Sequence, residues 1–243
     1  MKVPPTLRAE RTPANSSPQA QASARGTAAY YPAFLDLSGR LCLVVGGGTV
    51  AQRKAEALLE AGALVTVVSP RLTKGLKALA EDGAISAMVR RYRRGDLRQA
   101  VLVVAATNNP TVNQSVAADA SRRGILVNVV DEPALCSFIV PAVVKRGDLV
   151  LAISTGGKSP AVAKRLRRDL ESWLDSGPAQ LLGLAAEVRQ ELRAHGQRPS
   201  PRRWQSALDN HLMALVREGK RDEARRRLLS SLVGAGEGVE LPA

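Results

Sequence analysis

The sequence predicts an α/β protein of 243 residues, with a parallel β-sheet first, a short antiparallel pair of strands next and a helical C-terminal region last. Three observations support this fold class. Short apolar runs alternate with helix-like segments in the first half, a turn separates two apolar runs in the middle, and the last third carries apolar residues at helical spacing. We therefore expect two layers of helices around one sheet, followed by a region with a different architecture.

The N-terminal residues 1–28 differ from the rest of the chain. They are rich in Pro, Ala, Ser and Gln and contain almost no large apolar side chains. Such a segment buries too little apolar surface to offset its conformational entropy, so we predict a disordered tail. It also lacks the apolar core of a secretory signal.

The sheet is predicted from unbroken apolar runs, which are typical of strands that are buried on both faces. Helix-like segments at 51–61 and 110–123 separate these runs, as βαβ units require. A weaker strand at 84–89 completes a five-stranded sheet. The four stronger predicted strands are Leu41–Val45, Leu64–Val68, Val101–Ala105 and Ile125–Val130.

The pattern changes after residue 137. Two apolar runs flank a turn at 146–148, which predicts an antiparallel pair, and a helix is expected from Pro160 to Leu174. The remainder is helical in pattern, and the final thirteen residues are expected to fray. Two apolar helix faces are predicted there, one formed by Leu184, Val188 and Leu192 and the other by Trp204, Leu208 and Leu212.

The glycine cluster that follows the first strand predicts nucleotide binding. Gly46, Gly48 and Ala51 fit the pattern G-x-G-x-x-A between a strand and a helix, which is the context of the dinucleotide-binding (Rossmann) fingerprint. In that fingerprint Gly46 allows the tight turn, Gly48 lets the pyrophosphate approach the backbone, and Ala51 lets the helix pack on the strand. The helix N-terminus would then hold the phosphates.

One part of the fingerprint is absent. An acidic residue normally ends the second strand and binds the ribose, but here the chain reads Ser69-Pro70-Arg71. The hydroxyl of Ser69 is able to bind the ribose, whereas Arg71 suits a 2′-phosphate. These residues leave the choice between NAD and NADP open.

A second glycine loop, "STGGKSP", lies between a strand and a helix. It is not a Walker-type phosphate loop, because position 152, where that pattern needs glycine, is alanine. Two interpretations remain: an anion site for substrate carboxylates, or a turn that Ser159 caps before Pro160. The candidate substrate-binding residues are Thr155, Gly156, Lys158 and Ser159.

Asp131 is the candidate catalytic residue. It ends a predicted parallel strand, and ligands of open α/β sheets bind at the carboxyl ends of the strands. The loop at 105–109 ends the neighbouring strand on the nicotinamide side, with Ala106 and Thr107 as candidate cofactor contacts. Asp131 is then placed to accept a proton, unless it only caps the turn before Pro133.

Composition narrows the class of function. The net charge is +13, which suits a polyanionic partner, but only 3% of residues are aromatic, which argues against nucleic acid. No run of about 18 apolar residues predicts a membrane span. The two cysteines have no spacing typical of zinc or disulfide sites, and Cys42 is expected to be a buried apolar side chain. His195 and His211 are expected to be structural or solvated, and no metal site is predicted.

Three segments together resemble the precorrin-2 dehydrogenase family, which forms the N-terminal module of siroheme synthase or stands alone. The resemblance covers residues 30–172 strongly and the helical tail loosely. The segments are "YYPAFLDLSGRLCLVVGGGTVAQRKAEALLEAGA", "AATNNPTVNQSVAADA" and "VNVVDEPALCSFIVPAVVKRGDLVLAISTGGKSPAVAKRLRRDLE".

The resemblance implies an activity and an organisation. The family oxidises precorrin-2 to sirohydrochlorin with NAD. The resemblance leaves open whether this chain also inserts ferrous iron into the product. The implied parts are the tail (1–28), an NAD-binding Rossmann domain (29–136), a dimerisation segment (137–172) and a helical C-terminal domain (173–243). A cytoplasmic homodimer is expected. A module that senses NAD and regulates a partner, without catalysis, is the alternative.

The resemblance also implies roles for particular residues. Thr49 and Val50 match the family's cofactor contacts in the glycine turn, and Pro70 and Arg71 match those after the second strand. Asp131 matches the aspartate of the family's N-V-V-D motif, which is implicated in both activities. Precorrin-2 carries eight carboxylates, and basic residues are expected to attract it electrostatically. These residues are Arg90, Arg91, Arg93, Arg94, Lys158 and the arginines of the C-terminal helices.

Overall fold

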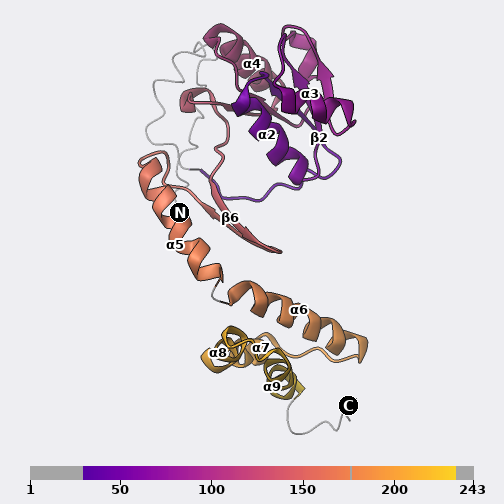
Figure 1. The fold of residues 1–243 in the computed structure, drawn as a ribbon, viewed down its shortest axis with the longest axis vertical. Helices are drawn as coiled ribbons and strands as arrows, with labels where there is room; N and C mark the ends of the chain where they lie inside the picture. The colour runs from indigo at the N-terminus through magenta and orange to yellow at the C-terminus, as the bar shows by residue number, and fades with distance from the viewer. Residues whose placement is uncertain (1–29, 176, 234–243) are drawn as a thin grey trace, which may run out of the picture. The chain divides into compact units, whose positions relative to one another are not determined.

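A computed structural model describes residues 30–175 and 177–233 (Figure 1). The predicted disordered tail at 1–28 lies outside these residues. The described residues form two compact units that divide between Val140 and Pro141. The boundaries of the four expected parts remain predictions.

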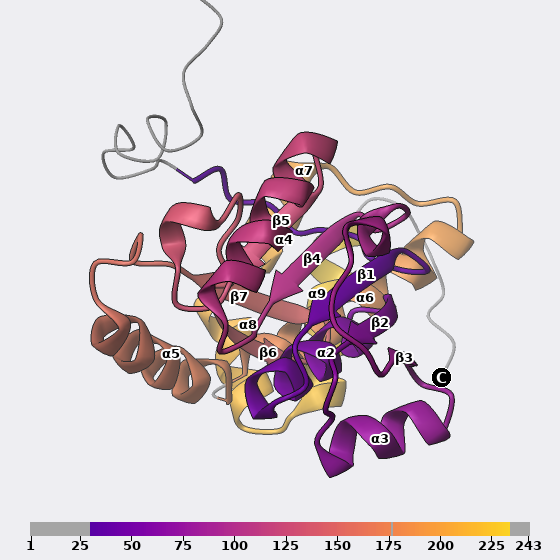
Figure 2. The same ribbon diagram turned by 90° about the horizontal axis from the view of Figure 1, so that it is seen from above.

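The first unit is built on a five-stranded parallel sheet with the strand order β3-β2-β1-β4-β5. The predicted parallel sheet is therefore confirmed, and β4, β1, β2 and β3 can be followed in this order in Figure 2. From β1 the chain proceeds to β2 and β3 on one side of the sheet, and then to β4 and β5 on the other side, so the strand order reverses between β1 and β4. The ligand-binding crevice of a doubly wound sheet lies at such a reversal. The strands are β1 (Leu41–Val45), β2 (Leu64–Val68), β3 (Ser86–Met88), β4 (Leu102–Ala105) and β5 (Leu126–Val129).

Both faces of this sheet are covered, which explains the unbroken apolar strands. On β1, Cys42 and Val44 face one core cluster, whereas Leu43 and Val45 face the other. Helices α2 (Thr49–Glu60) and α3 (Lys74–Glu81) contribute to the first cluster, and α4 (Pro110–Arg123) contributes to the second. The prediction for Cys42 is confirmed, and burial raises the pKa of its thiol to about 11.

Local signals set the helix ends. The Thr73 hydroxyl accepts a hydrogen bond from the Leu76 N–H at 3.2 Å and begins α3. Asn109 caps α4 in the same way, and Gly124, in the left-handed region at φ 67°, ends it. These caps give α4 the bounds expected from the sequence.

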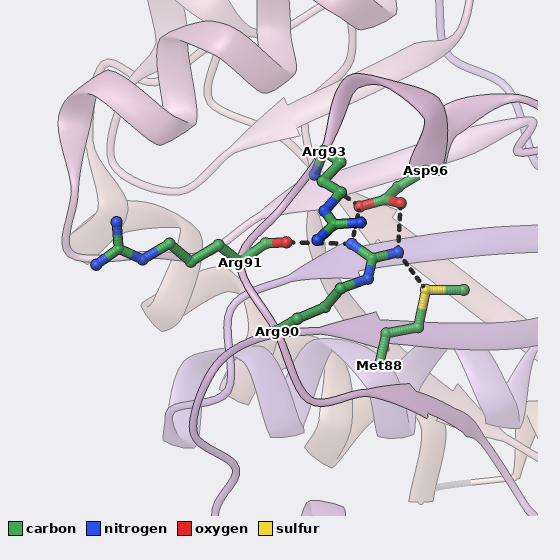
Figure 3. Close-up of polar contacts among 5 residues, drawn as sticks. All are labelled: Met88, Arg90, Arg91, Arg93 and Asp96. Carbon is green, nitrogen blue, oxygen red and sulfur yellow. Dashed lines mark hydrogen bonds and ion pairs between the residues drawn. The ribbon is translucent and has the colours of Figure 1, made fainter.

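An ion pair holds the segment between β3 and the short helix η1 (Arg94–Leu97) (Figure 3). The Arg90 guanidinium donates to both carboxylate oxygens of Asp96, at 2.7 and 2.8 Å, and this interaction lowers the pKa of Asp96. Arg94 is paired with the buried carboxylate of Asp119. Arg90 and Arg94 are therefore each held by an acidic partner, and the attraction of substrate by Arg90, Arg91, Arg93 and Arg94 stays a prediction.

The second unit begins with an antiparallel ribbon, formed by β6 (Ala142–Arg146) and β7 (Leu149–Ile153). Gly147, at φ 55°, makes the turn that joins them, as the sequence predicts. Helix α5 (Pro160–Asp175) packs against both strands. The ribbon and α5 together form the first part of this unit.

Four helices complete the second unit, and their core contains the predicted face of Leu184, Val188 and Leu192. The predicted face of Trp204, Leu208 and Leu212 is wrong, because Leu208 ends one helix and Asp209 caps the next. The predicted frayed end also begins too early, since the last helix runs to Val233. The helices are α6 (Pro178–Ala194), α7 (Pro201–Ala207), α8 (Asn210–Arg217) and α9 (Arg221–Val233).

Candidate functional site

The candidate site lies where β1, β4 and β5 end. The Ala106 N–H donates to the Val45 carbonyl at 2.8 Å, and the Val130 N–H donates to the Ala105 carbonyl at 2.9 Å. Three loops therefore leave the sheet in register at the same edge: the glycine turn, the loop after β4 and the turn that contains Asp131. The sheet topology thus brings together residues that are up to 85 positions apart in sequence (46 to 131).

The glycine turn packs too tightly for side chains at its first two positions. Gly46 has φ 132°, and a Cβ there would lie 2.3 Å from the Ala106 carbonyl oxygen. A Cβ on Gly47 would lie 1.9 Å from the Arg71 carbonyl oxygen. By contrast, a Cβ on Gly48 would meet nothing within 4 Å, so its surroundings are open. The fingerprint assigned no role to Gly47; the third consecutive glycine was the available signal.

The N-terminus of α2 is suited to phosphate. Gly48 is its N-cap and supplies no side-chain hydrogen bond, and the first turn contains no acidic residue. The first N–H groups and the positive end of the helix dipole are therefore available to an anion. Thr49 and Val50 are exposed at this end. These features fit the pyrophosphate of a dinucleotide.

Ser69 has a structural role in the turn after β2. Its side chain is buried, and its hydroxyl donates to the Arg71 carbonyl at 2.7 Å. This geometry argues against the ribose contact expected for Ser69. Pro70 and Arg71 are exposed, and no partner of the Arg71 guanidinium is found among the described residues. They remain the candidates for the adenosine end of the cofactor.

The loop after β4 is held by α4. The Thr107 hydroxyl donates to the Asn113 side-chain oxygen at 2.7 Å, and the Asn113 amide donates to the Thr107 carbonyl at 3.0 Å. The Thr107 hydroxyl can therefore offer a ligand an acceptor and no further donor. Ala106 is half-buried beside Gly46. Asn113, which sequence reasoning did not single out, fixes this loop.

Asp131 is exposed and has φ 61°, the single left-handed non-glycine residue among those described. Aspartate tolerates this conformation better than most residues, and its persistence requires support from the surrounding turn. Cys136 supplies part of that support: its Sγ accepts from the Val129 N–H at 3.1 Å and donates to the Glu132 carbonyl at 3.4 Å. The Cys136 thiol, to which the sequence analysis gave no role, therefore helps to hold the turn that contains Asp131.

The second glycine loop, 154–160, belongs to the second unit. Gly156 and Gly157 have φ 61° and 79°, and the Ser159 hydroxyl accepts from the Val162 N–H at 3.3 Å. The capped-turn interpretation of Ser159 is confirmed by this bond. The Thr155 hydroxyl lies 3.2 Å from the Ser159 carbonyl, and Lys158 is exposed. An anion contact at Thr155, Gly156, Lys158 and Ser159 stays a prediction.

Other candidate groups lie elsewhere. His195 and His211 are exposed, and His195 ends α6. No cluster of three or more His, Cys, Asp or Glu side chains suitable for a metal ion occurs within 30–175 and 177–233. In the same ranges, no helix combines the length and hydropathy needed to cross a bilayer.

Comparisons with known proteins agree with this geometry. Residues 33–142 match the family model described as putative NAD(P)-binding, and residues 146–172 match that of the sirohaem biosynthesis protein central region. The structure resembles SirC, a precorrin-2 dehydrogenase, with a TM-score of 0.67 and 30% sequence identity, covering 82% of this chain and 100% of that one. The chain belongs to the precorrin-2 dehydrogenase family. The resemblance found in the sequence is thereby confirmed.

Longer relatives, named siroheme synthases, also match. Siroheme synthase of Pseudomonas entomophila is 42% identical over 208 residues, which are 85% of this chain and 45% of that protein. Siroheme synthase of Azotobacter vinelandii is 39% identical over 208 residues, again 85% of this chain and 45% of that protein. The chain thus spans less than half the length of these relatives. Its first unit is an NAD(P)-binding domain of this family.

Proposed function

We propose that the protein oxidises precorrin-2 to sirohydrochlorin with NAD. The observation that supports this most directly is the exposed carboxylate of Asp131, held at φ 61° at the same sheet edge as the glycine turn. Membership of the precorrin-2 dehydrogenase family supports precorrin-2 as the substrate. A dinucleotide site alone would equally suit a sensor of NAD, but a sensor has no need of a base at the nicotinamide side.

The candidate site residues have different roles in the proposed oxidation. The α2 N-terminus and Gly48 would hold the pyrophosphate of NAD, and the loop of Ala106 and Thr107 would hold the nicotinamide half. The cofactor would supply a hydride acceptor, and loss of a hydride removes two electrons and one proton from the macrocycle. Asp131 accepts the second proton that the new double bond releases. Charge and mass then balance, with the reduced cofactor and sirohydrochlorin as products.

The choice of NAD over NADP is part of the proposal. The exposed Arg71 is chemically suited to a 2′-phosphate, whereas the family resemblance favours NAD. A cytoplasmic location is also proposed, because the enzyme needs free nicotinamide cofactor. The two buried, unpaired cysteines agree with a reducing compartment.

The direct test is anaerobic incubation of the purified protein with precorrin-2 and either NAD or NADP. We expect the sirohydrochlorin absorbance and the reduced-nicotinamide absorbance to rise together in equal amounts, faster with NAD. Adding ferrous iron to the same mixture tests for siroheme formation. Normal NAD binding with no oxidation by either cofactor would favour the sensing module instead.

We further propose that the protein is a homodimer through the ribbon and α5. A two-stranded ribbon is marginally stable alone, and each strand leaves one edge unpaired within the described chain. Apolar side chains remain exposed on this part of the unit, and a second copy is a natural partner for them. They are Val143 on β6 and Val162, Leu166 and Trp173 on α5.

Val143→Glu is expected to convert the dimer to a monomer, because it places a charge in the proposed interface. Light scattering at micromolar concentration measures the mass. Val89→Glu is the matched control, since Val89 is an exposed apolar residue of the first unit. A monomeric wild type, or a Val143→Glu variant that remains dimeric, contradicts the proposed interface.

A further inference from the structure

A groove in the second unit is lined by none of the residues assigned to the proposed reaction. It lies between α6 and α7, beside the segment 195–200 that joins them, and its volume is about 910 Å³. This lies within the range of small-molecule sites. Its lining includes Leu182, Arg189, Arg193, Arg198, Trp204 and Leu208.

Helix α6 carries two stripes, and only one of them is needed for the core. Leu184, Val188 and Leu192 pack against the other helices of the unit. A second stripe at positions i, i+4, i+7 and i+11 lines the groove with Leu182, Ala186, Arg189 and Arg193. Leu182, in this second stripe, is 40% exposed, so an apolar side chain lies open at the groove.

The two sides of α6 differ in charge: one carries ion pairs, and the other carries arginines that have no acidic partner among the described residues. On the side toward α9, Glu187 pairs with Arg221 at 2.6 Å and Glu191 pairs with Arg225 at 2.7 Å. The groove, in contrast, is lined by three arginines and no acidic residue. No side-chain partner of Arg189, Arg193 or Arg198 is found in the described ranges. The groove is therefore positively charged, and no acidic side chain in its lining balances this charge.

Apolar side chains of α7 form the opposite wall. Trp204 is half-buried on α7, and Leu208, which ends that helix, is 40% exposed. An indole face beside guanidinium groups suits a ligand that has both a planar apolar ring and anionic substituents. The break after α7, which sequence reasoning missed, is what leaves Leu208 at this wall instead of in the core.

We propose that this groove binds a polycarboxylated tetrapyrrole, with the ring against Trp204 and Leu208 and the carboxylates on Arg189, Arg193 and Arg198. The choice of a tetrapyrrole rests on the proposed function, because the substrate and product of that reaction have this chemistry. All residues that line the groove belong to the second unit, whereas the glycine turn and Asp131 belong to the first.

The test uses uroporphyrin, a stable octacarboxylate porphyrin, in the full-length protein without NAD. Trp173→Phe leaves Trp204 as the only tryptophan. We expect uroporphyrin to quench Trp204 fluorescence saturably, with weaker binding at higher salt. Arg189→Gln with Arg193→Gln should weaken binding about tenfold or more, because two charge-assisted contacts are lost. Protoporphyrin, with two carboxylates, should bind more weakly than uroporphyrin.

The matched control is Arg202→Gln with Arg226→Gln, which removes the same charge from exposed positions outside the groove. It should change the affinity less than twofold. Equal weakening by both double variants overturns the proposal, as does equal binding of protoporphyrin, or a change of oligomeric state on mutating the groove arginines. Precorrin-2 oxidation without quenching of Trp204 by uroporphyrin would contradict the groove site and leave the proposed function standing. Quenching without precorrin-2 oxidation would contradict the proposed function and leave a porphyrin-binding groove.

Discussion

Replacing Asp131 by alanine is expected to lower dehydrogenase turnover about 100-fold or more while the affinity for NAD is unchanged. The magnitude is that of losing a general base. NAD affinity should persist because the contacts assigned to the cofactor come from the glycine turn, the turn after β2 and the loop after β4. Turnover is measured anaerobically with precorrin-2, and NAD affinity is measured by calorimetry.

Two further variants separate basicity from backbone conformation. Alanine at φ 61° is strained, so Asp131→Ala alone mixes both effects. Asp131→Asn keeps the left-handed preference and the hydrogen-bonding capacity, and Asp131→Gly accepts the backbone without strain. Both should be as slow as Asp131→Ala if the carboxylate is the base. Glu132→Gln, at the exposed neighbouring acid, should retain nearly full turnover.

The contrary result would be clear. A fully active Asp131→Asn variant would remove Asp131 from the mechanism and assign it to the turn before Pro133. The positioning of the substrate against the cofactor, and the cofactor's own chemistry, would then account for catalysis. If the wild type also inserts ferrous iron, the same series tests whether that step shares the carboxylate, because metal insertion requires the pyrrole protons to be removed.

Replacing Gly48 by valine is expected to weaken NAD binding at least about 100-fold, or ~2.7 kcal/mol. A Cβ there meets no protein atom within 4 Å, and the φ of −84° is ordinary for any residue. The variant should therefore fold normally, with an unchanged melting temperature. Loss of binding would then arise from the overlap of the valine side chain with the pyrophosphate. Calorimetry with NAD measures the effect.

Gly47→Ala is the informative contrast. Its Cβ would lie 1.9 Å from the Arg71 carbonyl oxygen, so the turn must shift and the melting temperature should fall. Thermal unfolding distinguishes the two glycines: Gly47 matters for packing and Gly48 for the ligand. A folded Gly48→Val variant that binds NAD with wild-type affinity would show that the pyrophosphate lies elsewhere.

The sequence by itself determined the sheet and predicted the position of the candidate site. Strands β1 and β2 have the predicted bounds, because a strand buried on both faces must be an unbroken apolar run. The glycine cluster after the first strand and Asp131 after the fifth follow the same logic, since parallel strands end at one edge. The family resemblance adds the substrate, which no local pattern carries.

Only the tertiary structure decided which polar groups remain available. The Ser69 hydroxyl is donated to the Arg71 carbonyl, and Arg90 and Arg94 are paired with Asp96 and Asp119. The break at Leu208 likewise depends on the capping of α8 by Asp209, although the apolar spacing there continues. A side chain's type is local, but its partner comes from distant segments, so the free groups of a site emerge only when the chain has packed.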